Sequence, residues 1–460
     1  MKNKLGIFIF RRSYRLYDNT GLIECLKNNQ TVIPVFIFTP EQIKNNPYKS
    51  DNAVQFMVES LNDLDKQLRK KKSRLFFFYG RQDDVIRKLI NKYPIDSVYV
   101  NMDYTPYSIK RDKRIQKICK SNDVKFCIKE DILLNPIGSI KTDSDTIYKK
   151  FTPYFDKARS NTVDKPKSNN YNNYVSSRKK YVGEISKNRI KKFYEYNESK
   201  ACVGGRDNAL KILRSVSKFK QYNTKRNMLT YDTTKLSGYI KFGCVSIREV
   251  YHKIKDKLSS RNGLIRQLYW RDFYYNVAFA YPIIFSKKGN LKESYDKIKW
   301  DNNTRLFNRW KNAKTGFPIV DACITEMNTT GFMHNRGRLI VASFLVKTLL
   351  VDWKHGEKYF AQKLQDYDPA VNTGNWGWVS GSGADSQPYF RIFNPWSQGE
   401  KHDPDAIYIK KWLSELADIP AKHIHQWYKY HTEYDINYPD PIVDYSKMKK
   451  KVLSAYKKAL

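Results

Sequence analysis

Residues 366–378 combine polar groups with large aromatics at a spacing that could do chemistry. The stretch contains Asp366, Asp368, Asn372, Trp376 and Trp378. Carboxylates can bind a ring N–H, an amide can bind a ring nitrogen or oxygen, and indoles can stack on a ring or pass electrons. The combination suits a site for a flat ring with polar edges. Taken alone, the stretch fits a capped loop before a core helix equally well.

Two further blocks flank this stretch. Gly331–Arg338 reads Gly-Phe-Met-His-Asn-Arg-Gly-Arg, and Pro388–Gly399 reads Pro-Tyr-Phe-Arg-Ile-Phe-Asn-Pro-Trp-Ser-Gln-Gly. In this order and spacing, the three blocks resemble the flavin domain of the photolyase/cryptochrome family. The resemblance covers nearly the whole chain and is strongest over residues 222–412.

The composition favours a polyanionic partner. The chain has 460 residues, with 84 Lys and Arg against 46 Asp and Glu, and a formal net charge of +38. A balance this basic is typical of proteins that bind nucleic acid, although a lysine-rich coding bias would give a similar excess. The 15% aromatic content supplies rings for stacking on bases or on a cofactor.

The cysteines and the N-terminus indicate an intracellular, soluble protein. The six Cys are scattered, and none forms a C-x-x-C pair, so we expect no metal site and a reducing compartment. The apolar run at 5–10 is followed at once by Arg11 and Arg12, unlike a signal peptide. The apolar run at 339–351 is too short to span a bilayer and predicts a buried helix. The pattern does not distinguish cytoplasm from nucleus.

The first part of the chain alternates apolar strands with amphipathic helices. Strands are predicted at 5–10, 31–38, 75–79, 97–100 and 124–128, and helices around 51–71, 82–92 and 107–121. This alternation predicts an α/β domain with a parallel, doubly wound sheet over residues 1–135. A polar connector is expected at 136–198, with a surface loop or partly disordered stretch at 168–174. Residues 199–460 are predicted to form an all-α domain, beginning with a helix over 209–220, and the family resemblance implies that this domain binds FAD and the DNA lesion.

Two segments, 10–19 and 101–108, follow strands of the predicted sheet. Parallel sheets bind ligands beyond the carboxyl ends of their strands. Segment 10–19 resembles the first-strand motif of the family, with Ser13 and Tyr17 as variant positions. In the family this domain holds an antenna chromophore, a folate or a deazaflavin. The resemblance therefore implies one of these chromophores or an empty antenna site.

Hydroxyl-bearing residues precede a short apolar segment near residue 237. They belong to the run Thr233, Thr234, Lys235, Leu236 and Ser237. Hydroxyls and free backbone N–H groups ahead of a helix can bind phosphate, because the amides and the helix dipole both favour an anion. A plain helix cap is the alternative. In the family the same segment holds the pyrophosphate of FAD, and the resemblance also makes Tyr222 a cofactor contact and Arg226 a DNA-backbone contact.

One predicted helix face combines an amide, an indole and a guanidinium. Gln267, Trp270, Arg271 and Tyr274 lie at i, i+3, i+4 and i+7. Such a face could bind and stack on a nucleotide, or it could be an aromatic core stripe with a snorkelling Arg. By resemblance the face lies in the substrate pocket, with Trp270 on the lesion and Arg271 near the cofactor.

The resemblance implies roles for further residues. Asn335 would contact flavin and lesion, Arg336 would contact a DNA phosphate, and Arg338 would pair with Asp366 beside the isoalloxazine ring. Asn372 would face flavin N5. The remaining implied roles are Asp368 and Gln267 at the cofactor, Trp378 as a second wall of the lesion pocket, Arg391 at the DNA, and Trp376, Trp353 and Trp300 as the electron relay that reduces the flavin.

The implied activity is light-driven repair of cyclobutane pyrimidine dimers in UV-damaged DNA by a monomeric, FAD-bearing enzyme that binds no membrane. Family members specific for the (6-4) photoproduct use two His where this chain has Asn335 and Leu339. Gln267, however, stands where cyclobutane-dimer enzymes usually have Glu. A (6-4) photolyase and a single-strand DASH-type enzyme remain alternatives, as does a cryptochrome photoreceptor without repair activity.

Overall fold

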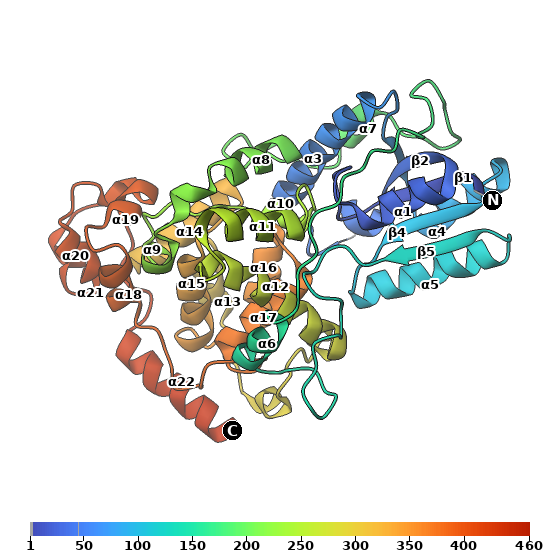
Figure 1. Cartoon of the computed structure of the whole chain (residues 1–460). Coiled ribbons are helices and arrows are strands. Elements are labelled where there is room, and N and C mark those ends of the chain that lie inside the picture. Colours follow the sequence, from blue (N-terminus) through green and yellow to red (C-terminus); the bar gives the residue numbers. More distant parts are fainter. Residues whose placement is uncertain (1–2, 45) are drawn as a thin grey trace.

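The computed structural model describes residues 3–44 and 46–460. Its N-terminal part is built around a parallel sheet. Within the described residues the strand order is β3-β2-β1-β4-β5, with every pairing parallel (Figure 1). The strands are β1 Asn3–Phe10, β2 Asn29–Phe38, β3 Phe76–Tyr79, β4 Ser97–Asn101 and β5 Lys125–Lys129. All five coincide with predicted strands, so the predicted parallel sheet is confirmed.

Helices cover both faces of this sheet because successive strand residues point to opposite sides. Phe8 and Phe10 pack with α1 (Thr20–Asn28) and α3 (Asp51–Arg69), whereas Ile7 and Ile9 pack with α4 (Gln82–Lys92) and α5 (Pro106–Lys120). The helices predicted at 51–71, 82–92 and 107–121 match α3, α4 and α5 within two residues. Two helices, α1 and the short α2 (Pro40–Ile43), were not predicted.

The connector packs against both domains. Its first helix, α6 (Phe151–Ala158), lies on α12 (Gly263–Ala280), and α7 spans Lys187–Lys191. The polar stretch at 168–174 leads to Tyr174, which is buried and pairs with Val32 where β2 extends beyond β3. The prediction of a surface loop or partly disordered stretch is wrong at the C-terminal end of this stretch, because Asn173 and Val175 exchange backbone hydrogen bonds with Val32.

The part of the chain that follows the connector is a helical domain, which confirms the predicted all-α fold. Its helices are α8 Arg206–Arg214, α9 Tyr222–Lys225, α10 Ser237–Lys241, α11 Ile247–Leu258, α12, α13 Thr304–Lys311, α14 Pro318–Thr330, α15 Asn335–Lys347, α16 Trp353–Lys363, α17 Pro369–Ser380, α18 Pro395–His402, α19 Ile407–Trp412, α20 Ala421–His425, α21 Trp427–Tyr430 and α22 Tyr445–Ala459. The helix predicted over 209–220 is split into α8 and the 3-10 helix η1 (Val216–Phe219). The buried helix predicted at 339–351 is α15, which begins and ends four residues earlier.

One hydrophobic cluster spans the two domains. Tyr14, just after β1, stacks on Phe242, just after α10, with ring centroids 5.8 Å apart. Phe56 of α3 also stacks on Phe242, at 5.5 Å. This contact brings the carboxyl end of β1 beside the helices that form the site described below. In the described part of the chain, no helix combines the length and apolar character needed to cross a bilayer.

Candidate functional site

Arg338 and Asp366 form the predicted ion pair. Nη2 of Arg338, on α15, lies 2.9 Å from Oδ2 of buried Asp366. The hydroxyl of Ser237, at the start of α10, donates to the same oxygen at 2.6 Å. The first turn of α15 is fixed by His334, whose Nδ1 accepts a hydrogen bond from the backbone N–H of Arg336. Asp366, which precedes α17, is thus joined to α15 through Arg338 and to α10 through Ser237.

Asp368 faces the N-terminal domain. One of its carboxylate oxygens accepts from backbone N–H groups at the start of α17 and caps that helix. The other accepts from the guanidinium of Arg12 and the hydroxyl of Tyr275. Burial alone would raise the pKa of Asp368, but the charges of Arg12 and Arg271 and these hydrogen bonds outweigh it and lower the pKa to about 2. Asp368 therefore remains ionised and links the domains.

A cavity of about 530 Å³ opens beside these two carboxylates, within the range of ligand-binding sites. Residues from α10, α11, α12, α15 and α17 line it. The lining includes every predicted cofactor residue: Tyr222, Thr233, Thr234, Lys235, Leu236, Ser237, Gln267, Arg271, Asn335, Arg338, Asp366, Asp368 and Asn372. Of the predicted DNA contacts it includes Arg226, Trp270, Asn335, Arg336 and Trp378. The fold therefore gathers residues from five separate sequence blocks at one cavity.

Arg391 is the predicted DNA contact that the cavity does not include. It is exposed on the loop between α17 and α18, and its Nη1 donates to Oε1 of Gln387 at 2.7 Å. Its backbone carbonyl accepts from Nζ of buried Lys347 at 3.0 Å. Arg391 thus lies on the protein surface, where a contact with the DNA outside the cavity stays a prediction.

Positive charge predominates in the cavity. Asp366 and Asp368 are each paired with Arg, while Lys241 also lines the wall and takes part in no ion pair among the described residues. Burial, and secondarily the nearby charge of Arg12, lowers the pKa of Lys241 to about 7. A site with unpaired cations and aromatic walls fits a cofactor that carries both phosphates and a flat ring.

The α12 face is more complex than its sequence pattern suggests. Gln267, Trp270, Arg271 and Tyr274 all line the cavity. The guanidinium of Arg271, however, donates to the carbonyl of Ile132 at 2.5 Å. The indole of Trp270 stacks on Phe151 of α6, with centroids 3.7 Å apart and planes 6° apart. Both alternatives from the sequence hold in part, because the same side chains reach the cavity and pack against the connector.

The three Trp of the predicted relay differ in burial. Trp376 lines the cavity and is 2% exposed, Trp353 at the start of α16 is 2% exposed, and Trp300 is half-buried. Trp376 packs against the backbone of α16, since a Cβ on Gly356 would lie 2.1 Å from its Cη2. Trp353 lies one turn earlier on that helix, and its Nε1 donates to Asn290 at 3.0 Å. Exposure therefore increases from the cavity-lining Trp376 to Trp300.

Four residues that shape the site were not predicted as site residues. Arg12 and Tyr275 hold Asp368, Lys241 supplies a cation, and Glu357 of α16 accepts hydrogen bonds from Asn372. A buried acid inside a helical pattern could have drawn attention to Glu357. Arg12 lies in the family-like segment 10–19, from which only an antenna site was predicted, and the sequence around Tyr275 and Lys241 carries no comparable signal.

Comparisons with known proteins agree with this arrangement. Residues 7–169 match the DNA photolyase family model, and residues 264–458 match the FAD binding domain of DNA photolyase. The deoxyribodipyrimidine photo-lyase of Alkalihalophilus pseudofirmus is 33% identical over 476 residues, which cover 97% of each chain. That of Escherichia coli is 30% identical and covers 98% of each chain.

Solved structures of photolyases also match this chain over nearly its whole length. An archaeal photolyase from Sulfolobus tokodaii, crystallised with two FAD molecules, is 41% identical with a TM-score of 0.89, covering 99% of this chain and 100% of the other. A class III photolyase from Agrobacterium tumefaciens is 30% identical with a TM-score of 0.91, covering 100% and 98%.

Proposed function

This chain belongs to the DNA photolyase/cryptochrome family of FAD-binding enzymes, and we propose that it repairs cyclobutane pyrimidine dimers in UV-damaged DNA under light. In this proposal, electron transfer from excited reduced FAD splits a dimer that has been flipped out of the duplex. The cavity in the helical domain is the proposed place of both cofactor and dimer.

The donor set of the cavity supports FAD as the resident cofactor. Ser237, Arg338 and Asp366 form a connected polar group on the cavity wall. We assign Thr233–Ser237 to the pyrophosphate and the Arg338–Asp366 pair to the isoalloxazine ring. Lys235 lies in this segment but is paired with Asp232 at 2.8 Å. Phosphate would therefore compete with Asp232 for its ammonium group.

Bound FAD supplies light absorption and one-electron transfer, which side chains cannot provide. The protein supplies the surroundings in which the dimer is held. Trp270 and Trp378 line the cavity from α12 and α17, and Gln267 and Asn335 add amides beside them. Flipping a nucleotide out of the duplex costs a few kcal/mol, and least for a damaged base. Stacking on the two indoles would offset this cost.

The preference for cyclobutane dimers rests on which residues line one wall of the cavity. Asn335 and Leu339 of α15 both line the cavity, at the positions where (6-4) enzymes place their two His. Among the described lining residues there is no His. The proton chemistry of a His pair would thus have no group to perform it here, whereas dimer splitting by electron transfer needs none.

The test uses purified protein whose FAD has been chemically reduced. One duplex carries a cyclobutane thymine dimer and another a (6-4) photoproduct, and both are illuminated with blue light beside a dark control. Chromatography of the products should show repair of the first duplex alone. Repair of the (6-4) product would overturn the proposed specificity, and repair of neither lesion, as a duplex or a single strand, would favour a photoreceptor.

An antenna chromophore in the N-terminal domain is a second part of the proposal. Arg11, after β1, is buried, and within the described residues its Nε and Nη2 have no hydrogen-bond partner; the same holds for Nη2 of Arg111. Burial, and secondarily the charge of Arg111, lowers the pKa of Arg11 to about 10. A folate, a deazaflavin or a second FAD, as in the Sulfolobus relative, would each bring an anionic group. Chromatography of chromophores released from the protein would distinguish them.

A further inference from the structure

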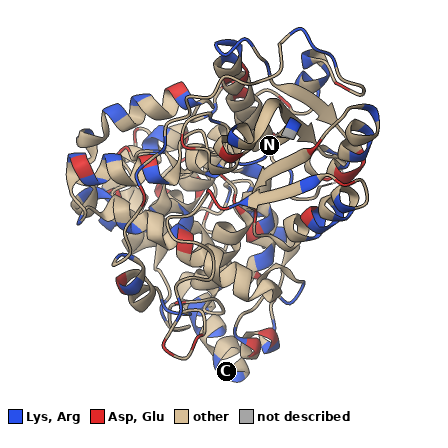
Figure 2. Cartoon of the chain, turned by 45° about the vertical axis from the view of Figure 1, so that its right-hand side comes forward, with Lys and Arg blue, Asp and Glu red and all other residues tan. Residues whose placement is uncertain are grey.

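Cations are concentrated on one surface that extends from the N-terminal domain to the edge of the cavity. Segments 63–74, 176–195 and 206–226 together contain twenty Lys and Arg and five Asp and Glu, whereas the whole chain has 84 and 46. Figure 2 shows Lys and Arg on all parts of the molecule, so the total charge alone does not locate a binding surface. The local excess of Lys and Arg in the three segments does locate one. These three segments are called the basic surface below.

The three segments lie together in space. Arg74 donates its Nε to the carbonyl of Ser177 at 3.0 Å and its Nη2 to that of Lys179 at 2.9 Å, which fixes the connector beside the start of β3. The backbone N–H of Arg206 donates to Asp63 at 3.1 Å and joins the start of α8 to α3. Figure 1 accordingly shows α3, α7 and α8 along one edge of the molecule.

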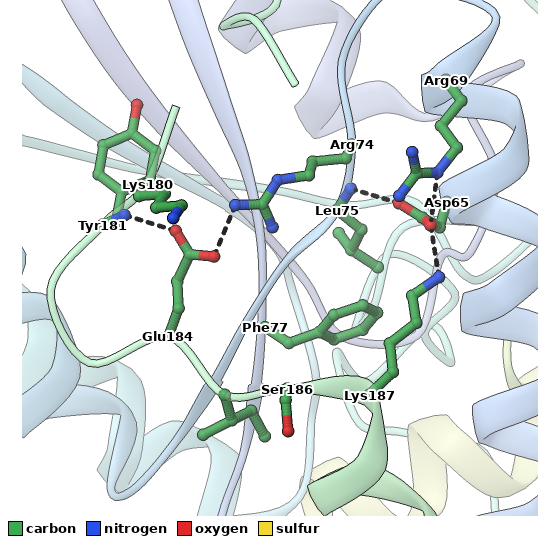
Figure 3. A pocket seen from close by; sticks show the side chains of 11 residues that line it. Asp65, Arg69, Arg74, Leu75, Phe77, Lys180, Tyr181, Glu184, Ser186 and Lys187 are labelled. Carbon is green, nitrogen blue, oxygen red and sulfur yellow. Dashed lines mark hydrogen bonds and ion pairs between the residues drawn. The ribbon is translucent and has the colours of Figure 1, made fainter. Parts of the chain in front are cut away.

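The basic surface contains a pocket of about 370 Å³ (Figure 3). Its two carboxylates are neutralised within the protein: Asp65 pairs with Lys187 at 2.8 Å and Glu184 with Arg74 at 2.7 Å. Lys180 also lines the pocket, is exposed, and takes part in no ion pair among the described residues. The surplus positive charge is therefore available to an anion from outside the molecule.

The basic surface also reaches the cavity. Lys66 of α3 and Lys70, the residue that caps its C-terminus, follow Asp63 at i+3 and i+7, so they share the face that meets the start of α8. Exposed cations continue through α8 and η1 to Arg226, which lines the cavity. At 1.5 Å per residue, α8 spans about 14 Å and the stretch 63–70 about 12 Å. Together these lengths correspond to roughly seven to eight base pairs of duplex at 3.4 Å each.

We propose that the basic surface binds the phosphates of DNA flanking the lesion, so that the N-terminal domain holds one arm of the duplex whose damaged base occupies the cavity. The proposal rests on the proposed function, because that function brings DNA to the cavity. Contacts of this kind recognise charge and spacing alone, so they add affinity that depends on salt and not on sequence.

The experiment compares two triple variants with the unmodified holoprotein. The surface variant K70Q/K179Q/K180Q removes three exposed charges that form no ion pair in the described structure. The matched control K113Q/K117Q/K120Q removes three exposed charges from α5, on the opposite face of the sheet. Affinity for dimer-bearing duplexes of about 10 and about 40 base pairs, and for undamaged duplexes of the same lengths, is measured by fluorescence anisotropy over a range of salt concentrations. Thermal unfolding checks that both variants fold.

On the long duplex, the negative slope of log K against log salt should become less steep in the surface variant, by about 0.9 for each phosphate that the variant no longer neutralises. The control should not change the slope, and on the short duplex all three proteins should behave alike. Equal slopes for both variants on the long duplex would overturn the proposal while leaving the proposed function intact. Failure of the unmodified protein to prefer either damaged duplex over undamaged DNA would overturn both.

Discussion

Asn372 is held by Glu357 through two hydrogen bonds, from its Nδ2 to the backbone carbonyl at 3.1 Å and to the carboxyl Oε1 at 2.9 Å. Asn372 lines the cavity from α17, and Glu357 lies behind it on α16 and is buried. Burial raises the pKa of Glu357 from its ordinary 4.5 to about 7, even though hydrogen bonds from Asn372 and Thr373 favour the charged form. The orientation of the Asn372 amide thus depends on the Glu357 carboxyl group, whose pKa lies near neutrality.

This coupling predicts a pH-dependent stability. Because the pKa of Glu357 is raised in the folded protein, its stabilising contribution is complete below the ordinary 4.5 and is lost as the pH rises to about 7. Glu357→Gln mimics the protonated form at every pH. Over that window the variant should gain about 1.4 kcal/mol of unfolding free energy per pH unit relative to wild type. Urea unfolding at pH 5 and pH 8 measures the difference, and a pH-independent difference would contradict it.

Replacement of Trp376 should interrupt the proposed electron relay at its cavity end. Trp376→Phe should slow photoreduction of oxidised flavin, while repair by chemically reduced enzyme is spared. Absorbance spectra recorded under blue light measure the reduction. Trp310→Phe is the matched control, since Trp310 is also buried in this core but was not predicted to belong to the relay. Equal photoreduction by wild type and Trp376→Phe would remove Trp376 from the relay.

Trp270 should contribute to the recognition of damaged DNA. Trp270→Ala should weaken binding to dimer-bearing DNA by about 1–3 kcal/mol, the usual contribution of one base–aromatic stack. Because Trp270 also stacks on Phe151, a loss of folding would imitate this effect, and binding to undamaged DNA of the same length provides the control. An equal loss for both DNAs, measured by anisotropy, would assign Trp270 to packing alone.

Replacement of Gln267 tests whether the cavity is adapted to an amide or to an acid at this position. If this amide is a weaker form of the acid usual in cyclobutane-dimer enzymes, Gln267→Glu should raise the rate of dimer repair. The rate is measured with pre-reduced enzyme under saturating light and compared with Gln267→Ala. A rate below wild type for Gln267→Glu would show that the pocket is adapted to the amide.

The strands of the sheet could be predicted because a buried parallel strand is a continuous apolar run. The helix α1 was missed because it spans only nine residues and begins Thr-Gly. The helix predicted over 209–220 is interrupted at Ser215, whose Oγ bonds to the carbonyls of Lys211 and Ile212. A side chain that competes for backbone groups in this way favours the end of a helix.

The predicted site residues came from local motifs, and the cavity gathers most of them. The residues missed act through distant partners: Arg12 lies 356 positions from Asp368, and Tyr275 lies 93 positions from it. No local pattern signals such pairs. The same limit applies to the polar connector, whose pairing with Val32 depends on where β3 begins relative to β2.

The contact of Arg12 with Asp368 has a consequence for the modularity of the chain. Asp368 is a buried anion whose main counterion belongs to the other domain. A foreign first half that covered Asp368 without an equivalent cation would bury this charge without its main partner, at a cost of several kcal/mol. Grafting a foreign first half onto this chain would succeed only if the loop after its first strand supplied an equivalent cation. The two halves are therefore constrained to change together.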